Sequence, residues 1–218
     1  MSFEVVVFDC DGTLVDSQAM ILAAMSEAFD GAAVPVPDGA AVRAVIGLSL
    51  DEAVRALAPQ LGIDAHVELA RRYRAAFTTL RAEARYEEPL FPGIAALVAE
   101  LDEAGRRLAI ATGKSRRGVA HLLAEHGLEQ RFVSVQTADG NPSKPHPEML
   151  RRAIAEAGGR PEEACMIGDT TFDMEMAKHA GVVAIGVGWG HHAPAQLTAA
   201  GARAVAVDAA DLRGLLQS

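Results

Sequence analysis

The sequence predicts an α/β protein, a Rossmann-like parallel sheet flanked by helices, with an α-helical cap domain inserted after the first strand. Short runs rich in β-branched residues are almost continuously apolar, as in strands buried on both faces, and they lie at 3–8, 108–111, 132–136, 165–167, 182–187 and 204–207. Helical patterns lie between most of these runs, at 93–104, 116–126, 147–157 and 172–180. Alternation of strands and helices is typical of a parallel sheet.

The interval between the first strand and residue 93 breaks this alternation, because it contains no convincing strand. Its helical patterns cover 17–29, 39–46, 50–61 and 64–81. Pro35 and Pro37 separate the first two, and Pro59 with Gly62 ends the third. A block of this length is too long for a loop. We therefore expect an α/β core domain at 1–16 and 87–218 and a helical cap domain at 17–86, with hinges near 16–17 and 84–89.

Composition narrows the classes of partner. The net charge of −9 disfavours a nucleic-acid partner, since nucleic acids are bound by neutralising phosphates with lysine and arginine. No apolar stretch approaches the roughly 20 residues of a membrane span, and the N-terminal residues do not resemble a signal peptide. The cysteines Cys10 and Cys165 are too few to suggest a disulfide framework. We expect a cytoplasmic protein without a membrane partner; nothing in the sequence indicates its oligomeric state.

Polar residues follow four of the predicted strands. Along the chain they are Asp9 and Asp11, then Thr112 with Gly113 and Lys114, then Lys144, then Asp169 with Asp173. Ligands of an open parallel sheet bind beyond the carboxyl ends of its strands, so we expect these groups to converge on one rim.

Asp9 and Asp11 are two residues apart at a strand end. Carboxylates this close repel each other unless a cation lies between them or one holds a proton. A hard cation such as Mg²⁺ takes one or two carboxylates together with a substrate phosphate. One carboxylate could then attack phosphorus while the other handles the proton of the leaving group, and Gly12 would permit the tight turn. By itself the pair could also be a turn that caps a helix.

The segment DCDGTLVD at 9–16, Thr112, Lys144 before Pro145, and GDTTFD at 168–173 resemble, in this order, the four motifs of the haloacid dehalogenase superfamily. The insertion point after the first motif resembles the subfamily with a helical cap. Within that subfamily the chain is most similar to phosphoglycolate phosphatase-like members. The resemblance covers nearly the whole chain.

The resemblance implies roles for the two carboxylates of the first motif and for the metal site. Asp9 would be the nucleophile that becomes an aspartyl-phosphate. Asp11 would be the general acid for the leaving alcohol and then the base for water, with its main-chain carbonyl on Mg²⁺. Asp9, Asp11 and Asp169 would together form the Mg²⁺ site.

The remaining motifs would bind the phosphoryl group. Thr112 and Lys144 would hold its oxygens, assisted by backbone N–H groups around Asp11 and Gly113. Asp173 would orient Lys144 or a metal-bound water. This division suits phosphoryl transfer, in which positioning and charge neutralisation supply most of the catalysis.

Other residues carry open alternatives. Lys114 could contact substrate or begin a solvated helix, and Arg43 in the cap could meet a substrate carboxylate or face solvent. His191 and His192 could line the cleft between core and cap or lie on the surface; adjacent histidines without a further ligand do not indicate a metal site. Thr112 and Asp169 could instead cap the helices that follow them.

Rival functions remain within this resemblance. Dehalogenases of the superfamily lack the second aspartate, which is Asp11 here, and phosphonate-cleaving members need a cap lysine, which 17–85 does not contain. A sugar phosphomutase, a pyrophosphatase or 5′-nucleotidase, and a non-catalytic binding protein stay open. The sequence thus predicts a Mg²⁺-dependent phosphatase acting on a small phosphorylated metabolite similar to phosphoglycolate.

Overall fold

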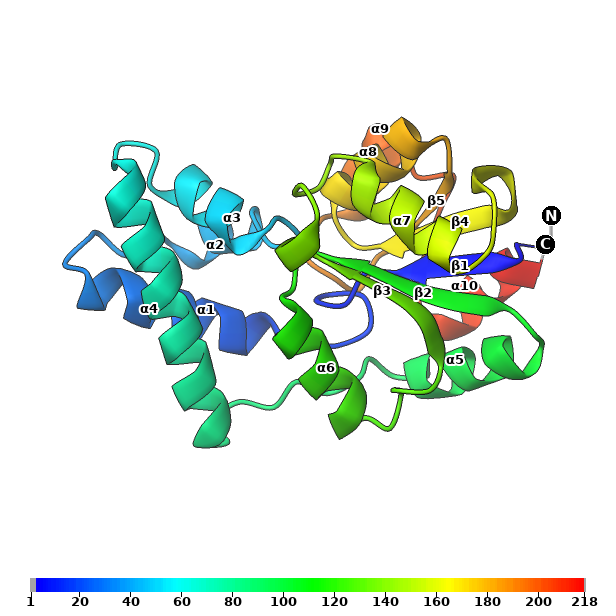
Figure 1. Cartoon of the computed structure of the whole chain (residues 1–218), viewed down its shortest axis with the longest axis horizontal. Coiled ribbons are helices and arrows are strands. Elements are labelled where there is room, and N and C mark those ends of the chain that lie inside the picture. The colour runs from blue at the N-terminus through cyan, green and yellow to red at the C-terminus, as the bar shows by residue number, and fades with distance from the viewer. Residues whose placement is uncertain (1–2, 218) are drawn as a thin grey trace.

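The computed structural model of the chain describes residues 3–217. Its centre is a six-stranded sheet in the order β3-β2-β1-β4-β5-β6, and every pairing in it is parallel. The strands are β1 (Val5–Phe8), β2 (Arg107–Thr112), β3 (Phe132–Thr137), β4 (Ala164–Gly168), β5 (Val183–Val187) and β6 (Ala204–Ala206). The predicted α/β class is confirmed, and β1 lies at the centre between β2 and β4 (Figure 1).

Helices cover both faces of the sheet. Successive side chains of a strand point to opposite faces, so Val6 and Phe8 of β1 enter one apolar cluster and Val5 and Val7 the other. The first cluster includes side chains of α5 (Ile94–Glu103), α6 (Arg116–Glu125) and α10 (Ala209–Gln217). The second includes those of α7 (Glu148–Glu156), α8 (Thr171–Ala180) and α9 (Pro194–Ala200). Burial on both sides explains why the strands are almost continuously apolar.

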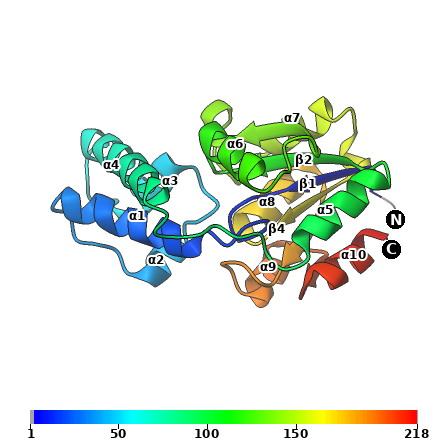
Figure 2. The same cartoon turned by 90° about the horizontal axis from the view of Figure 1, so that it is seen from below.

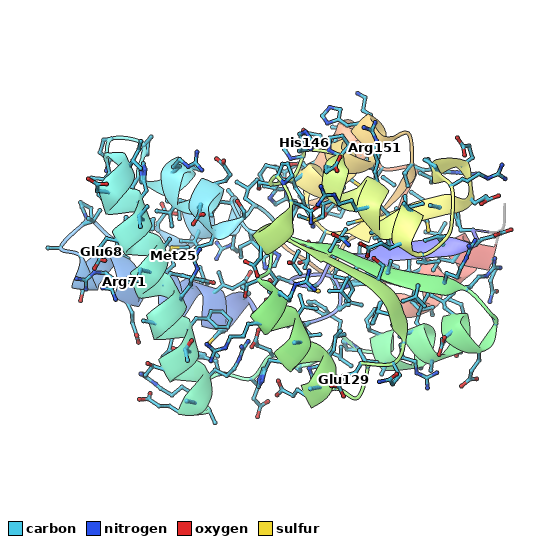
Figure 3. The ribbon with its side chains drawn as sticks, in the orientation of Figure 1. Met25, Glu68, Arg71, Glu129, His146 and Arg151 are labelled. Atoms are coloured by element: carbon cyan, nitrogen blue, oxygen red, sulfur yellow. The ribbon has the colours of Figure 1, made fainter. Side chains whose placement is uncertain are left out.

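The helices of the inserted block form a separate group beside the sheet (Figures 1 and 2). They are α1 (Gln18–Gly31), α2 (Gly39–Arg43), α3 (Leu50–Leu57) and α4 (Ile63–Ala82). Met25 of α1 is buried in the apolar cluster that α1 shares with α4, whereas Glu68 and Arg71 form an exposed 2.7 Å ion pair on α4 (Figure 3). This group has its own apolar interior, which is what a cap domain requires.

Two chain segments connect the helical group to the sheet, and they run side by side. The backbone N–H of Asp16 donates to the carbonyl of Pro89 (2.9 Å), and that of Phe91 donates to the carbonyl of Leu14 (2.9 Å). The predicted hinges lie at these two segments.

Several element boundaries differ from the sequence-based expectations. The helix expected at 39–46 ends at Arg43, before Gly47 adopts a φ of +101°. The helix expected at 50–61 ends at Leu57. Helices α9 and α10 were not predicted, although Pro194 in the first turn and Gly201 after the end are the usual signals for a helix such as α9. Among residues 3–217, none of the helices is long and apolar enough to cross a membrane.

Candidate active site

Three neighbouring strands bring the predicted site residues to one rim. Asp9 follows β1, Thr112 ends β2 and Asp169 follows β4, and all three are buried. Because β2, β1 and β4 are adjacent and parallel, their carboxyl ends meet at the same edge. Lys144 reaches this edge from the loop between β3 and α7 and is also buried.

Lys144 joins the first and fourth motifs. Its Nζ lies 2.9 Å from Asp9 Oδ2 and donates to Asp173 Oδ1 at 2.6 Å. Asp9 Oδ1 accepts from the N–H of Cys10 at 2.7 Å. The other oxygen of Asp173 accepts from the hydroxyl (2.7 Å) and the N–H (3.1 Å) of Thr170, which caps α8. Asp173 therefore contacts both the N-terminus of α8 and the ammonium of Lys144.

The electrostatics of this group favour a proton or a cation on Asp9. Burial raises the pKa of Asp9 to about 7, against the attraction of Lys144 and with the help of the nearby Asp173 and Asp169. Burial lowers the pKa of Lys144, but Asp173 and Asp9 more than offset this effect and hold the lysine in its charged form. A bound divalent cation would satisfy the excess of buried negative charge.

Asp169 is fixed from three directions. Its Oδ1 accepts from the hydroxyl of Thr13 (3.0 Å), and its Oδ2 accepts from the N–H of His191 (2.8 Å). The Nδ1 of His191 lies 2.7 Å from the same Oδ2. Gly12, with a φ of +78°, packs so closely that a Cβ there would lie 2.2 Å from Asp169 Oδ2 and 2.3 Å from His191 Nδ1. His191 is thus a buried member of the site rather than a surface residue.

The chemistry of the carboxylates fits a hard cation. Asp9, Asp169 and Asp173 each offer an oxygen, and these oxygens lie within 4.8 Å of one another. Asp9 Oδ2 has no hydrogen bond of sound geometry among the described residues and so retains capacity for a ligand. Asp9 and Asp169 could hold Mg²⁺ here. Asp11 was predicted to contribute its main-chain carbonyl to the metal site, and its carboxylate lies outside this group of oxygens.

The carboxylate of Asp11 faces the helical domain. Its Oδ1 accepts from Lys114 Nζ (2.7 Å) and from the hydroxyl of Ser17 (2.6 Å). Burial raises the pKa of Asp11, but Lys114 and Ser17 more than compensate, so the net shift is downward. Lys114 also lies 3.2 Å from Glu88 Oε1. The structure therefore places Lys114 inside the site, where the sequence left its position open.

A cavity of about 740 Å³ separates the strand ends from the helical domain. The core contributes to its lining the predicted residues Asp9, Asp11, Thr112, Gly113 and Lys114. The helical domain contributes apolar side chains such as Phe77 of α4, together with the charged residues Asp51, Arg55, Arg74 and Arg81. Arg43, the predicted cap contact, is not among the described lining residues, and its guanidinium lies instead against Gly39.

The loop of residues 46–49 contacts the strand ends directly. A Cβ on Gly113 would lie 2.6 Å from the carbonyl oxygen of Gly47 and 2.5 Å from that of Leu48. The N–H of Ser49 donates to the hydroxyl of Ser143, next to Lys144, at 2.8 Å. Gly113 is therefore needed for close contact between the two domains, in addition to the phosphoryl-binding role that the resemblance implies.

Sequence reasoning missed several residues of this site. Thr13 belongs to the first motif, and its hydroxyl could have been expected to face the strand rim. Ser17 begins the predicted cap and could have been read only as a helix cap. Glu88 lies in the segment between α4 and α5, where no sequence pattern marks it, so its contact with Lys114 required the tertiary structure.

Fold and site together define an α/β enzyme core with an acidic, cation-competent site at the carboxyl end of its sheet and a helical domain across it. The chain belongs to the haloacid dehalogenase-like hydrolase family, whose profile matches residues 6–187. The family expected from the four motifs is confirmed.

Individual relatives are similar to this chain over most of its length. The chain is 40% identical to the probable phosphatase IndB of Dickeya dadantii, over 89% of this chain and 85% of that protein. It is 30% identical to a phosphoglycolate phosphatase of Vibrio vulnificus, over 87% and 85% of the two chains. It is 34% identical to the tyrosine-protein kinase PtkA of Mycobacterium tuberculosis, over 86% of this chain but 63% of that longer protein.

Solved structures share the fold along the whole chain. A hydrolase from Pseudomonas syringae is 26% identical and matches with a TM-score of 0.88, covering 98% of this chain and 97% of its own. The similarity therefore includes the helical domain as well as the sheet.

Proposed function

We propose that this chain is a Mg²⁺-dependent phosphatase that hydrolyses a small phosphate monoester through an aspartyl-phosphate on Asp9. The observation that carries the proposal is the buried Asp9 carboxylate at the cavity wall, with Lys144 2.9 Å from its Oδ2 and Asp169 beside it. This arrangement supports the proposal, because Asp9 would serve as the nucleophile and Lys144 as a fixed cation beside the phosphoryl group. Relatives named as phosphatases support the same reaction.

The reaction would proceed in two displacements. In the first, an oxygen of Asp9 bonds to phosphorus, the bond from phosphorus to the leaving oxygen breaks, and Asp11 delivers a proton to the leaving alkoxide. In the second, water attacks phosphorus, Asp11 accepts its proton, and the Asp9 carboxylate is released with inorganic phosphate. Lys144 and Thr112 would bind phosphoryl oxygens throughout, and Mg²⁺ would supply further charge neutralisation.

The hydrogen bonds of Asp11 must change before it can donate a proton in the first displacement. Lys114 and Ser17 both use Oδ1 of Asp11 and help to lower its pKa. For Asp11 to carry a proton to the leaving group, Lys114 must give up part of this contact. A substrate whose leaving alcohol bears a carboxylate would attract Lys114 and so favour that exchange.

The physiological substrate we propose is accordingly a small anionic phosphate ester similar to phosphoglycolate, hydrolysed in the cytoplasm. Lys114 is the candidate for the second anionic group, because its ammonium borders the cavity beside Asp11. The name of the Vibrio relative supports this choice.

The test measures phosphate release from p-nitrophenyl phosphate and from phosphoglycolate, with Mg²⁺ and with EDTA. We expect release only with the metal, and we expect Asp9→Asn to abolish it while Asp30→Asn, an exposed aspartate of α1, retains it. Rapid quenching followed by peptide mass spectrometry should find the phosphoryl group on the peptide that contains Asp9. Equal inactivity of both variants and the intact chain across pH and metals would contradict the proposal. Isomerisation of a sugar phosphate that far exceeds phosphate release would indicate a mutase instead.

A further inference from the structure

A chain of four charged side chains connects the site to the helical domain. Lys114 Nζ donates to Asp11 Oδ1 (2.7 Å) and lies 3.2 Å from Glu88 Oε1. The other oxygen of Glu88 accepts from Nε of Arg81 (3.1 Å) and also from its Nη2. Lys114 belongs to the core, Arg81 to α4, and Glu88 to the segment between them.

Three of these four side chains are largely shielded from solvent, whereas that of Arg81 is 22% exposed. The side chains of Lys114, Glu88 and Asp11 are 8%, 7% and 14% exposed. The two positive and two negative charges of these four side chains balance one another. When one partner of a buried pair is removed, the remaining charge is left desolvated without compensation. Glu88 therefore differs from a solvent-exposed carboxylate, whose ion pairs contribute little to stability.

Glu88 is fixed at its backbone as well. Its carbonyl oxygen lies 3.0 Å from Nε2 of His126, the residue that follows α6. The main chain that carries the Glu88 carboxylate is thus held in place. One carboxylate oxygen contacts Lys114 of the core, and the other contacts Arg81 of the helical domain. Phe77, one helical turn before Arg81 in α4, borders both cations, with its ring centre 4.8 Å from the guanidinium carbon of Arg81 and 5.4 Å from Lys114 Nζ.

We propose that Glu88 is a positioning residue that holds the ammonium of Lys114 at the cavity wall, where it meets the leaving group of the substrate. A lysine side chain has four rotatable carbons and loses considerable entropy when it is fixed. Without Glu88, Asp11 would be the only carboxylate among residues 3–217 that pairs with Lys114, and it would hold the ammonium in a single ion pair. Glu88 and Asp11 both pair with the ammonium of Lys114, and Arg81 fixes the position of the Glu88 carboxylate. The kinetic part of this inference rests on the proposed phosphatase function.

The position of Lys114 can be tested without any reaction. The chain has only three lysines, Lys114, Lys144 and Lys178, so ¹⁵Nζ NMR of the ammonium groups gives few signals. In Glu88→Gln we expect the Lys114 signal to shift and its protons to exchange faster with water, while those of Lys144 and Lys178 stay unchanged. Glu87→Gln is the matched control, because Glu87 is the exposed neighbour. A Lys114 signal that does not respond to Glu88→Gln would overturn the inference.

A second variant covers a failure of Glu88→Gln to fold. Arg81→Met leaves Glu88 in place but removes its other partner, so Glu88 can rotate. We expect the same Lys114 signal to move, by a smaller amount. If the signal stays unmoved in Arg81→Met, the inference is wrong.

Kinetics then separate positioning from simple support of the hinge. For an ester with a carboxylate on its leaving group, we expect Glu88→Gln to lower kcat/KM by about tenfold, mainly through KM. In a Lys114→Met background the same change should have less than about a twofold effect, because Glu88 acts through that lysine. Glu88→Asp should recover part of the loss.

The outcomes distinguish the two proposals. A full loss from Glu88→Gln in the Lys114→Met background would show that Glu88 only supports the fold and would overturn the positioning role. Absence of phosphate release from every ester by the intact chain would contradict the phosphatase proposal, and the NMR comparison would still decide where Lys114 is held.

Discussion

Lys144 and Asp9 form an ion pair in the interior of the protein, with Nζ 2.9 Å from Oδ2 and side chains that are 0% and 1% exposed. The two residues come from distant parts of the chain, and the pair is completed by Asp173 at 2.6 Å from the same Nζ. The ammonium of Lys144 thus pairs with two buried carboxylates, so the charge balance of the site depends on this lysine.

Replacing Lys144 should therefore reduce stability as well as activity. We expect Lys144→Met to lower the free energy of unfolding by about 3–5 kcal/mol at pH 8 in EDTA, because it leaves two buried carboxylates unpaired. Urea denaturation measures this quantity. Lys178→Met, at an exposed position of α8, should cost less than about 1 kcal/mol. Addition of Asp173→Asn to Lys144→Met should restore part of the loss; equal effects of the two lysine variants would contradict the prediction.

The raised pKa of Asp9 predicts a particular pH dependence. Because its pKa rises from 3.8 to about 7 in the folded state, the folded chain binds more protons than the unfolded chain between these values. The contribution of Asp9 to stability therefore falls as pH rises through this window. Asp9→Asn cannot titrate, so its stability relative to the intact chain should increase by up to about 1.4 kcal/mol per pH unit between pH 4 and 7 and level off above. Urea denaturation in EDTA should show this trend, and a constant difference across pH would refute it.

Gly12 should tolerate no side chain. A Cβ there would meet Asp169 Oδ2 at 2.2 Å in addition to the unfavourable φ of +78°. Gly105 has a φ of +77° but open space around it, so Gly105→Ala isolates the backbone cost. We expect Gly12→Ala to be less stable than Gly105→Ala by about 1–3 kcal/mol, the usual cost of overpacking. Thermal or urea unfolding measures both, and equal losses would show that the contact relaxes freely.

His191 should support the proposed Mg²⁺ site through Asp169. Burial lowers the pKa of His191, but its bond to Asp169 outweighs this and raises it. Partners that orient a metal-binding carboxylate typically change metal affinity by 10–100-fold, and we expect His191→Ala to raise the Kd for Mg²⁺ by about that factor. Isothermal titration calorimetry at fixed pH measures this Kd. His66→Ala, on α4 of the helical domain, should leave it unchanged, and an unaltered Kd in His191→Ala would exclude the supporting role.

Local sequence patterns were sufficient for the sheet and for much of the site. Continuous apolar runs such as Val5–Phe8 predict strands buried on both faces, and the polar residues after them predict the rim at which Asp9, Thr112 and Asp169 lie. The order of strands and polar residues along the chain is enough to predict this rim, because parallel strands align their carboxyl ends. The family followed from the same residues.

Contacts across the domain boundary could not be predicted in this way. Arg43 was a candidate contact for a substrate carboxylate, yet it is not among the described residues that line the cavity, and its guanidinium lies against Gly39. Helix α2 ends at Arg43, and the loop with Gly47 contacts the core. Helix direction after a short turn depends on packing against the rest of the protein, and the local sequence does not specify it.

The sequence by itself determined the α/β class and the strand-end position of the carboxylates, because strand periodicity depends only on local residues. The family and the role of Lys144 came from the resemblance of the four motifs to a known family. The tertiary structure decided what surrounds these carboxylates. It placed Lys144 between Asp9 and Asp173, His191 beside Asp169, and Lys114 beside Glu88 of the segment between α4 and α5. Such contacts depend on how the loops and the helical domain pack over the sheet. Only this packing brings together charged residues that are far apart in the sequence.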